Sequence, residues 1–251
     1  MKFFFLTFLL FQIIVVKAQL AIIDDPDGFV NVREGKGSNT KIVGKLTNDQ
    51  SFLYDGENIN DQWVMVFFND ENEVNFNLSG NNKAVHLQGF IHRSRLKPIT
   101  SLPHSGLTKV NRLLTTNHLI IKNDSIFLSV TTRPFNVKNH KILRSNDDCE
   151  NCAKLFVDKI DGKKPNGVDG GLPTVEISSI KLTIKNMAVD FPSDSFNDLY
   201  QPNFNDIGIY FDKNANIYIY MPGNSDGAGG YDLVWVVRHG KLLYRYIDSI
   251  G

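Results

Sequence analysis

The chain lacks an excess of charge of either sign. Its 251 residues include 27 lysines and arginines and 27 aspartates and glutamates. Domains that bind nucleic acids concentrate basic residues in a patch or stripe. The composition therefore argues against a nucleic acid as the partner of this protein.

The chain also lacks a second long hydrophobic run. Its one such run, residues 3–16, follows Lys2 and precedes the small residues of the segment 16–18. The run is shorter than the roughly 20 apolar residues that a membrane-spanning helix needs, and its pattern is typical of a secretory signal. We predict that residues 1–18 are a signal peptide. The mature protein is then exported, periplasmic or extracellular, with no stable membrane insertion; a permanent N-terminal anchor is the alternative.

Cysteine is scarce, with only Cys149 and Cys152 present. In an exported protein such a close pair typically forms a short-range disulfide, and we predict a structural one here. A redox pair would need a thiolate of low pKa, whereas the acidic residues at 147, 148 and 150 raise the pKa of a thiol. A four-ligand zinc site would need a second ligand pair. We expect no metal and no cofactor.

Motifs of common hydrolases are missing. The six histidines form no His-Glu-x-x-His pattern, and no Gly-x-Ser-x-Gly is present. Three Ser-x-x-Lys sequences occur without the Ser-Asp-Asn or Lys-Thr-Gly elements that accompany them in β-lactamase-like enzymes. We therefore predict a protein that is not an enzyme, with an unrecognised hydrolase as one alternative.

What the chain does have is a regular spacing of turn residues. Asn, Asp and Gly recur about every ten residues between segments rich in Val, Ile, Phe and Tyr, a pattern that favours short strands. We predict a mainly β fold of antiparallel sheets in two domains, residues 20–99 and 118–251. Residues 100–117, with Pro103 and Gly106, read as a linker in which 110–114 form one helical turn.

The first domain carries ordered motifs. It opens with Asp-Gly-Phe-Val-Asn-Val-Arg at 27–33, continues with Val-Gly-Lys-Leu at 43–46 and Trp-Val at 63–64, and closes with Gly-Phe-Ile-His at 89–92. In this order the motifs resemble those of a bacterial SH3-like (SH3b) domain. The resemblance implies a small β-barrel that serves binding. The polar segment from residue 69 to 88 is longer than the tight hairpin of that family, so any groove beside it would be reshaped.

Aromatic side chains in this domain suggest a ligand site. Aromatic-lined grooves recognise extended peptides, which are already stiff and lose little entropy on binding. We predict that Phe29 and Trp63 contact the ligand, with Asn31, Arg33 and His92 as polar contacts. The alternative is that the aromatic residues belong to the barrel core, and that Asn31 and Arg33 support a turn and a surface ion pair.

The second domain is predicted to contain nine strands, at 118–122, 125–132, 155–159, 175–185, 187–191, 207–212, 216–221, 230–238 and 241–247. Several of its segments resemble exported bacterial proteins of no assigned activity. The resemblance implies a folded domain but gives no mechanism for it. Two loops have residues of the kinds found in ligand-binding loops. The glycine-rich loop 226–232 reads as a tight turn, with anion binding as the alternative, and 212–216 reads as a hairpin turn, with calcium as the alternative.

These observations combine into one functional hypothesis. The chain is predicted to be an exported, non-enzymatic binding protein whose SH3-like unit engages cell-wall peptide or a segment of an envelope protein. The alternative from a different class is an interaction or inhibitor-type protein of the envelope that acts through residues 118–251.

Overall fold

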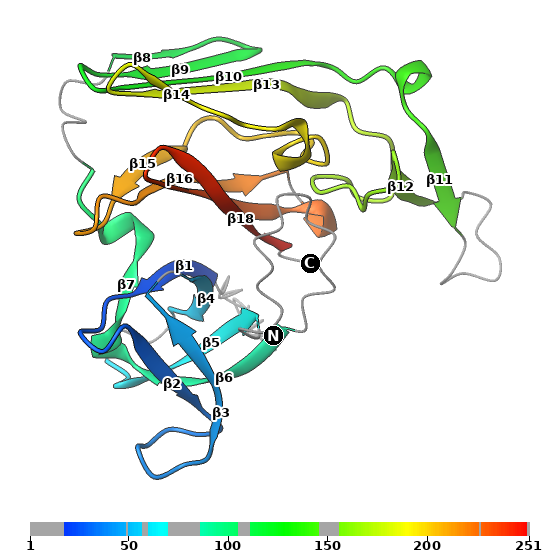
Figure 1. Ribbon diagram of the computed structural model, residues 1–251. Coiled ribbons are helices and arrows are strands. Elements are labelled where there is room, and N and C mark those ends of the chain that lie inside the picture. The colour runs from blue at the N-terminus through cyan, green and yellow to red at the C-terminus, as the bar shows by residue number, and fades with distance from the viewer. Residues whose placement is uncertain are drawn as a thin grey trace, which may run out of the picture.

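The computed structural model describes residues 18–48, 50–56, 60–69, 86–104, 111–145, 156–225 and 227–249. Across these ranges the chain consists of antiparallel strands and a few single turns of 3-10 helix, which confirms the predicted mainly β fold (Figure 1). The predicted signal peptide, apart from Ala18, lies outside the described residues, as do Cys149 and Cys152.

Seven strands form the N-terminal sheet, in the order β3-β2-β6-β5-β4-β1-β7. They are β1 (Ala18–Ile23), β2 (Phe29–Arg33), β3 (Ile42–Thr47), β4 (Ser51–Asp55), β5 (Trp63–Asn69), β6 (His86–His92) and β7 (Leu96–Pro98). β1 pairs with both β4 and β7, although the sequence pattern did not predict it. Hydrogen-bonded pairing leaves β3 and β7 at the ends of the sheet. The closed barrel implied by the family resemblance stays a prediction.

The period-two alternation of β2 decides which side chains reach the core of this unit. Val32 is fully buried, together with Ile91 of the neighbouring strand β6 and Val64 and Val66 of β5 beyond it. Phe29 at the start of the same strand is 36 % exposed. Because successive strand residues point to opposite faces, the segment 29–33 presents its polar and aromatic residues outward, as the sequence indicates.

Gly89 in the closing motif allows close contact between β6 and β2. A Cβ atom at this position would lie 2.6 Å from Cγ1 of Val32 and 2.7 Å from the carbonyl oxygen of Arg33. Gly89→Ala should therefore lower the free energy of unfolding by about 1–3 kcal/mol through overpacking, as measured by urea denaturation. Gly171→Ala is the matched control, since a Cβ there meets nothing within 4 Å. Equal stability losses in the two variants would contradict this explanation.

The C-terminal region contains two larger sheets and one hairpin. The five-stranded sheet has the order β14-β13-β10-β9-β8, and the four-stranded sheet has the order β15-β16-β17-β18. The first comprises β8 (Asn111–Leu114), β9 (His118–Lys122), β10 (Ile126–Pro134), β13 (Val175–Ile184) and β14 (Met187–Val189). The second comprises β15 (Gly208–Phe211), β16 (Ile217–Asn224), β17 (Tyr231–Arg238) and β18 (Lys241–Ser249). The hairpin consists of β11 (Ile142–Ser145) and β12 (Phe156–Ile160).

All nine strands predicted for this region are present, with ends within three residues of the expected positions. The helical turn predicted at 110–114 is wrong, because residues 111–114 form β8 and pair with β9. The apolar pair Leu113 and Leu114 fits either structure locally. β9 supplies backbone partners that a single helical turn lacks, so the sheet determines the conformation.

Three layers of sheet are stacked, with the four-stranded sheet in the middle (Figure 1). On β17, Trp235 packs toward the five-stranded sheet, whereas Val234 and Val236 pack toward β1 and β4 of the N-terminal unit. Every residue of β17 from 231 to 237 is buried. This strand is covered on both faces, which accounts for its nearly continuous apolar sequence.

Polar contacts also join the N-terminal unit to the middle layer. The backbone amide of Ser51 donates to the hydroxyl of Tyr244 at 3.0 Å, and Leu102, inside the predicted linker, is 5 % exposed in the shared core. Asp24 is bonded to both Lys97 and Lys213, and these hydrogen bonds lower the pKa of its carboxyl group. The two predicted domains therefore share one continuous interface.

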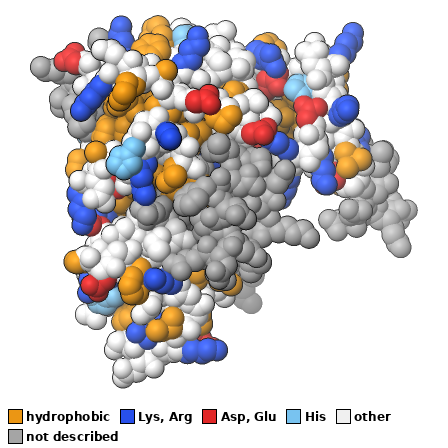
Figure 2. All heavy atoms as spheres, viewed as in Figure 1, with side chains coloured by type: hydrophobic (Ala, Val, Ile, Leu, Met, Phe, Trp, Pro, Cys, Tyr) orange, Lys and Arg blue, Asp and Glu red, His pale blue; other side chains and the backbone are white. Residues whose placement is uncertain are grey.

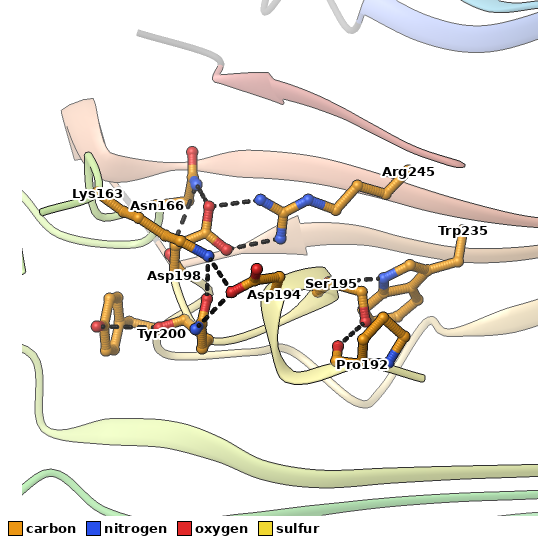
Figure 3. A network of polar contacts seen from close by, with 10 residues as sticks. Lys163, Asn166, Pro192, Asp194, Ser195, Asp198, Tyr200, Trp235 and Arg245 are labelled. Carbon is orange, nitrogen blue, oxygen red and sulfur yellow. Dashed lines mark hydrogen bonds and ion pairs between the residues drawn. The ribbon is translucent and has the colours of Figure 1, made fainter. Parts of the chain in front are cut away.

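A buried ion pair fastens the segment before β15 to the last strand (Figure 3). Arg245 of β18 donates from Nη1 to Oδ1 of Asp198 at 2.6 Å and from Nη2 to Oδ2 at 2.5 Å. Their side chains are only 1 % and 3 % exposed. Nearby, the indole Nε1 of Trp235 donates to the carbonyl oxygen of Ser195 at 3.0 Å. This network has almost no solvent access and serves to hold the fold together.

Candidate functional site

The five residues predicted to bind a ligand lie on one face of the N-terminal sheet. Trp63 on β5 is the cross-strand partner of His92 on β6, and their rings meet edge to face with centroids 5.6 Å apart. Arg33 on β2 lies opposite Phe90 of β6. Since Val32, Val64 and Ile91 point into the core, these side chains occupy the opposite, outward face, which we call the β2-β6-β5 face.

Several residues of the β2-β6-β5 face also have structural contacts. Nη1 of Arg33 donates to the carbonyl oxygen of Thr40 at 2.7 Å and supports the loop before β3. Nδ1 of His92 accepts from the backbone amide of Ser94 at 3.3 Å and so caps the short 3-10 helix η1 (Arg93–Arg95). The surface ion pair considered for Arg33 is thus replaced by a hydrogen bond to a backbone carbonyl.

The aromatic rings of this face are available to a partner. Phe29 is 36 % exposed, Trp63 is half-buried, and neither belongs to the buried core. The alternative interpretation, in which these two rings belong to the core, therefore does not hold, and their contact with a ligand stays a prediction. The ammonium group of Lys45 lies 3.9 Å from the centroid of the Phe29 ring, a distance suited to a cation–π contact. The face thus combines rings with the positive charge of Arg33, and Lys45 of the neighbouring strand β3 adds a second positive charge beside it.

The loop 212–216 and the described part of the glycine-rich loop, residues 227–232, are turns, as predicted, while Asp226 lies outside the described residues. Oδ1 of Asp212 accepts from the backbone amides of Asn214 and Asn216 at 2.9 and 2.8 Å. Its carboxylate is thus occupied in closing the hairpin between β15 and β16. In the glycine-rich loop, a Cβ at Gly229 would lie 2.6 Å from the backbone of Val168. The glycine there permits packing between two loops of the protein.

One cavity among the described residues was not predicted from the sequence. A cavity of about 620 Å³ opens at the end of the C-terminal sandwich where four hairpin turns meet. Its walls combine residues from four turns that are distant in the sequence: 123–126; 184, 185 and 187; 211, 214, 215 and 217; and 237, 239 and 240. The sequence predicts a turn at each of these four places. It does not show that the four turns lie next to one another in the folded chain.

Comparison with known protein families, curated proteins and solved structures finds none that this chain matches. The resemblance to an SH3-like domain therefore stays a prediction drawn from the motifs. Within the described ranges, no helix is long and apolar enough to cross a membrane, and no three His, Cys, Asp or Glu side chains are grouped closely enough to hold a metal ion.

Proposed function

We propose that this chain is an exported, non-enzymatic binding protein whose β2-β6-β5 face engages an extended peptide, either the peptide of the cell wall or a segment of an envelope protein. The observation that carries the proposal is the gathering of Phe29, Asn31, Arg33, Trp63 and His92 on one outward face. The assignment of an SH3-like domain is part of the same proposal.

The chemistry of the face suits such a ligand. An extended peptide presents side chains at regular intervals, and exposed rings bury apolar groups without losing much conformational freedom. Lys45 of β3 places positive charge beside the Phe29 ring, and Arg33 adds a guanidinium group on the same face. Guanidinium and ammonium groups bind carboxylates through charge-assisted hydrogen bonds, so the favoured peptide carries free carboxylates.

Co-sedimentation with purified peptidoglycan tests this proposal. The protein should pellet with the cell wall, and Phe29→Ala or Trp63→Ala should each weaken the apparent affinity by about 5- to 30-fold, the range of an interface residue worth about 1–2 kcal/mol. Phe127→Ala is the matched control, because Phe127 on β10 is 37 % exposed and lies outside the face. Its binding should equal that of the unmodified protein.

Affinity capture from an envelope extract separates the two kinds of peptide. A stoichiometric protein partner that is lost with Trp63→Ala would favour a protein segment over cell-wall peptide. If the protein binds either partner and both Phe29→Ala and Trp63→Ala behave like the control, the β2-β6-β5 face is not the site. The interaction or inhibitor-type alternative, acting through the C-terminal unit, would then be preferred.

A further inference from the structure

The described lining of the cavity in the C-terminal sandwich shares no residue with the β2-β6-β5 face. The cavity lies where the turns that join β9 to β10, β13 to β14, β15 to β16 and β17 to β18 come together, at the left-hand end of the two upper sheets in Figure 1. Figure 2 shows hydrophobic side chains at this end of the molecule. We infer that the cavity is a second binding site, and that its ligand is an uncharged, largely apolar small molecule.

The inner part of the cavity is apolar. Ile126 and Ile217 are buried at 7 % and 5 % exposure, and Val237 is 1 % exposed. All three belong to the core between the two C-terminal sheets, and Ile184 and Phe211 pack against that core from the cavity wall. A hydrocarbon chain or ring placed here leaves water and gains packing contacts with these side chains.

Two of the four turns are too short to fold over the opening. Lys185 and Asn186 are the only residues between β13 and β14, and His239 and Gly240 are the only residues between β17 and β18. All four have positive φ, from 47° to 73°, as in the type I′ turn of a two-residue hairpin. Such a turn reverses the chain at once, so the apolar end of the core stays accessible between the two turns.

The described lining holds no excess of either charge. Lys185 is its one lysine or arginine and Asp124 its one aspartate or glutamate. Both residues are exposed, as is His239, so water can solvate all three head groups. An ion that enters an apolar cavity loses hydration, and only a buried opposite charge offsets that loss. The described walls supply no such charge, which favours an uncharged ligand over an anion or a cation.

The walls are held in place before any ligand arrives. Oδ1 of Asn123 accepts from the backbone amides of Ser125 and Ile126 at 2.8 and 2.7 Å. The amide of Lys185 donates to the carbonyl oxygen of Ser125 at 2.7 Å and joins two of the turns. A site that is already formed loses little conformational entropy on binding.

The size of the cavity favours a small molecule over a protein segment. Its volume of about 620 Å³ falls within the range of roughly 300–1,000 Å³ that is typical of small-molecule sites. A partner segment needs an extended groove, whereas these four turns surround one compact hollow. The ligand that fits volume, lining and charge is a molecule with a hydrocarbon body and no ionised group.

Methyl NMR with 1-octanol as the probe tests the inference. In protein labelled at the isoleucine δ1 methyl groups, octanol should shift the signals of Ile126, Ile184 and Ile217 in a saturable manner. Ile22 and Ile91, in the N-terminal unit, should not move. Octanoate and octylammonium carry the same chain with a negative and a positive head, and each should bind at least about tenfold more weakly than octanol.

One variant locates the site at the described opening. Met187 lines the cavity and is 62 % exposed, so Met187→Asp places a charge at the mouth and should weaken octanol binding about five- to tenfold. Leu143→Asp is the matched control, because Leu143 on β11 is 53 % exposed and lies outside the described lining. Octanol should bind this control as it binds the unmodified protein.

Three results would overturn the inference. The first is the absence of saturable shifts in the three cavity methyl groups at millimolar octanol. The second is tighter binding of octanoate or octylammonium than of octanol, since the cavity would then select an ion. The third is equal octanol affinity in Met187→Asp and Leu143→Asp. The first two need only the unmodified protein, and none depends on the peptide-binding face, so the two proposals fail separately.

Discussion

Replacing Arg245 with alanine should lower the free energy of unfolding by about 3–5 kcal/mol, the cost of leaving a buried charge without its partner. The guanidinium group is 1 % exposed and makes two charge-assisted hydrogen bonds to Asp198, which is 3 % exposed. In the variant, Asn166 remains within 3.3 Å of Oδ2 of Asp198 (Figure 3). One amide cannot replace a bidentate cation. Urea denaturation followed by circular dichroism measures the loss.

The matched control is an ion pair on the surface. Lys36 and Asp61 lie 2.9 Å apart with side chains 56 % and 40 % exposed, so Lys36→Ala should cost no more than about 1 kcal/mol. If Arg245→Ala fails to fold, Arg245→Lys keeps the charge but loses the bidentate geometry and should cost less. A loss below about 1 kcal/mol for Arg245→Ala would show that the pair does not secure the segment around Asp198.

Replacing Trp235 with alanine should cost about 3–5 kcal/mol, since a large side chain is removed from a close-packed interior. Trp235 is fully buried in the core between the two C-terminal sheets. Its ring meets that of Phe191 edge to face at 6.0 Å, and its Nε1 donates to Ser195. Trp235→Phe should cost less, because it retains most of the ring and loses the hydrogen bond. The midpoint of urea denaturation reports both losses.

Comparing the loss of stability in Trp63→Ala with that in Trp235→Ala separates the effect of burial from the effect of removing an aromatic ring. Trp63 is half-buried on the β2-β6-β5 face, and its removal leaves no closed cavity, so its cost in stability should be clearly smaller than that of Trp235→Ala. The protein has two tryptophans, which means that the fluorescence of Trp235→Phe reports Trp63 alone. Equal losses from the two alanine variants would mean that Trp235 is not the packing centre of the sandwich.

Local sequence patterns were sufficient to predict most strands of this protein. The alternation in 29–33 gave both a strand and the correct outward residues, because the side-chain period of a strand is two. The turn at Asp212 was also predictable, since an aspartate side chain bonds to amides a few residues along the chain. These features depend on neighbours in sequence, and a single chain contains that information.

The sequence pattern showed which side chains of the N-terminal sheet point outward, but it could not show whether they form a binding site. Phe29 and Trp63 were predicted to contact a ligand because aromatic side chains line peptide-binding grooves, and the structure brings them onto one face with His92. Arg33 and His92 also support their own loops, which composition and spacing do not reveal. Their hydrogen-bond partners are set by how the loops fold back on the sheet.

The sequence by itself determined a mainly β chain, the positions of its turns and the alternation within its strands. Tertiary structure alone decided that residues 111–114 form a strand, that β17 is covered on both faces, and that the two units share a core. It also decided that turns near residues 124, 185, 214 and 239 converge on one cavity. The physical reason is that these features arise from contacts between segments distant in the chain, whose pairing depends on the packing of whole sheets rather than on local propensity.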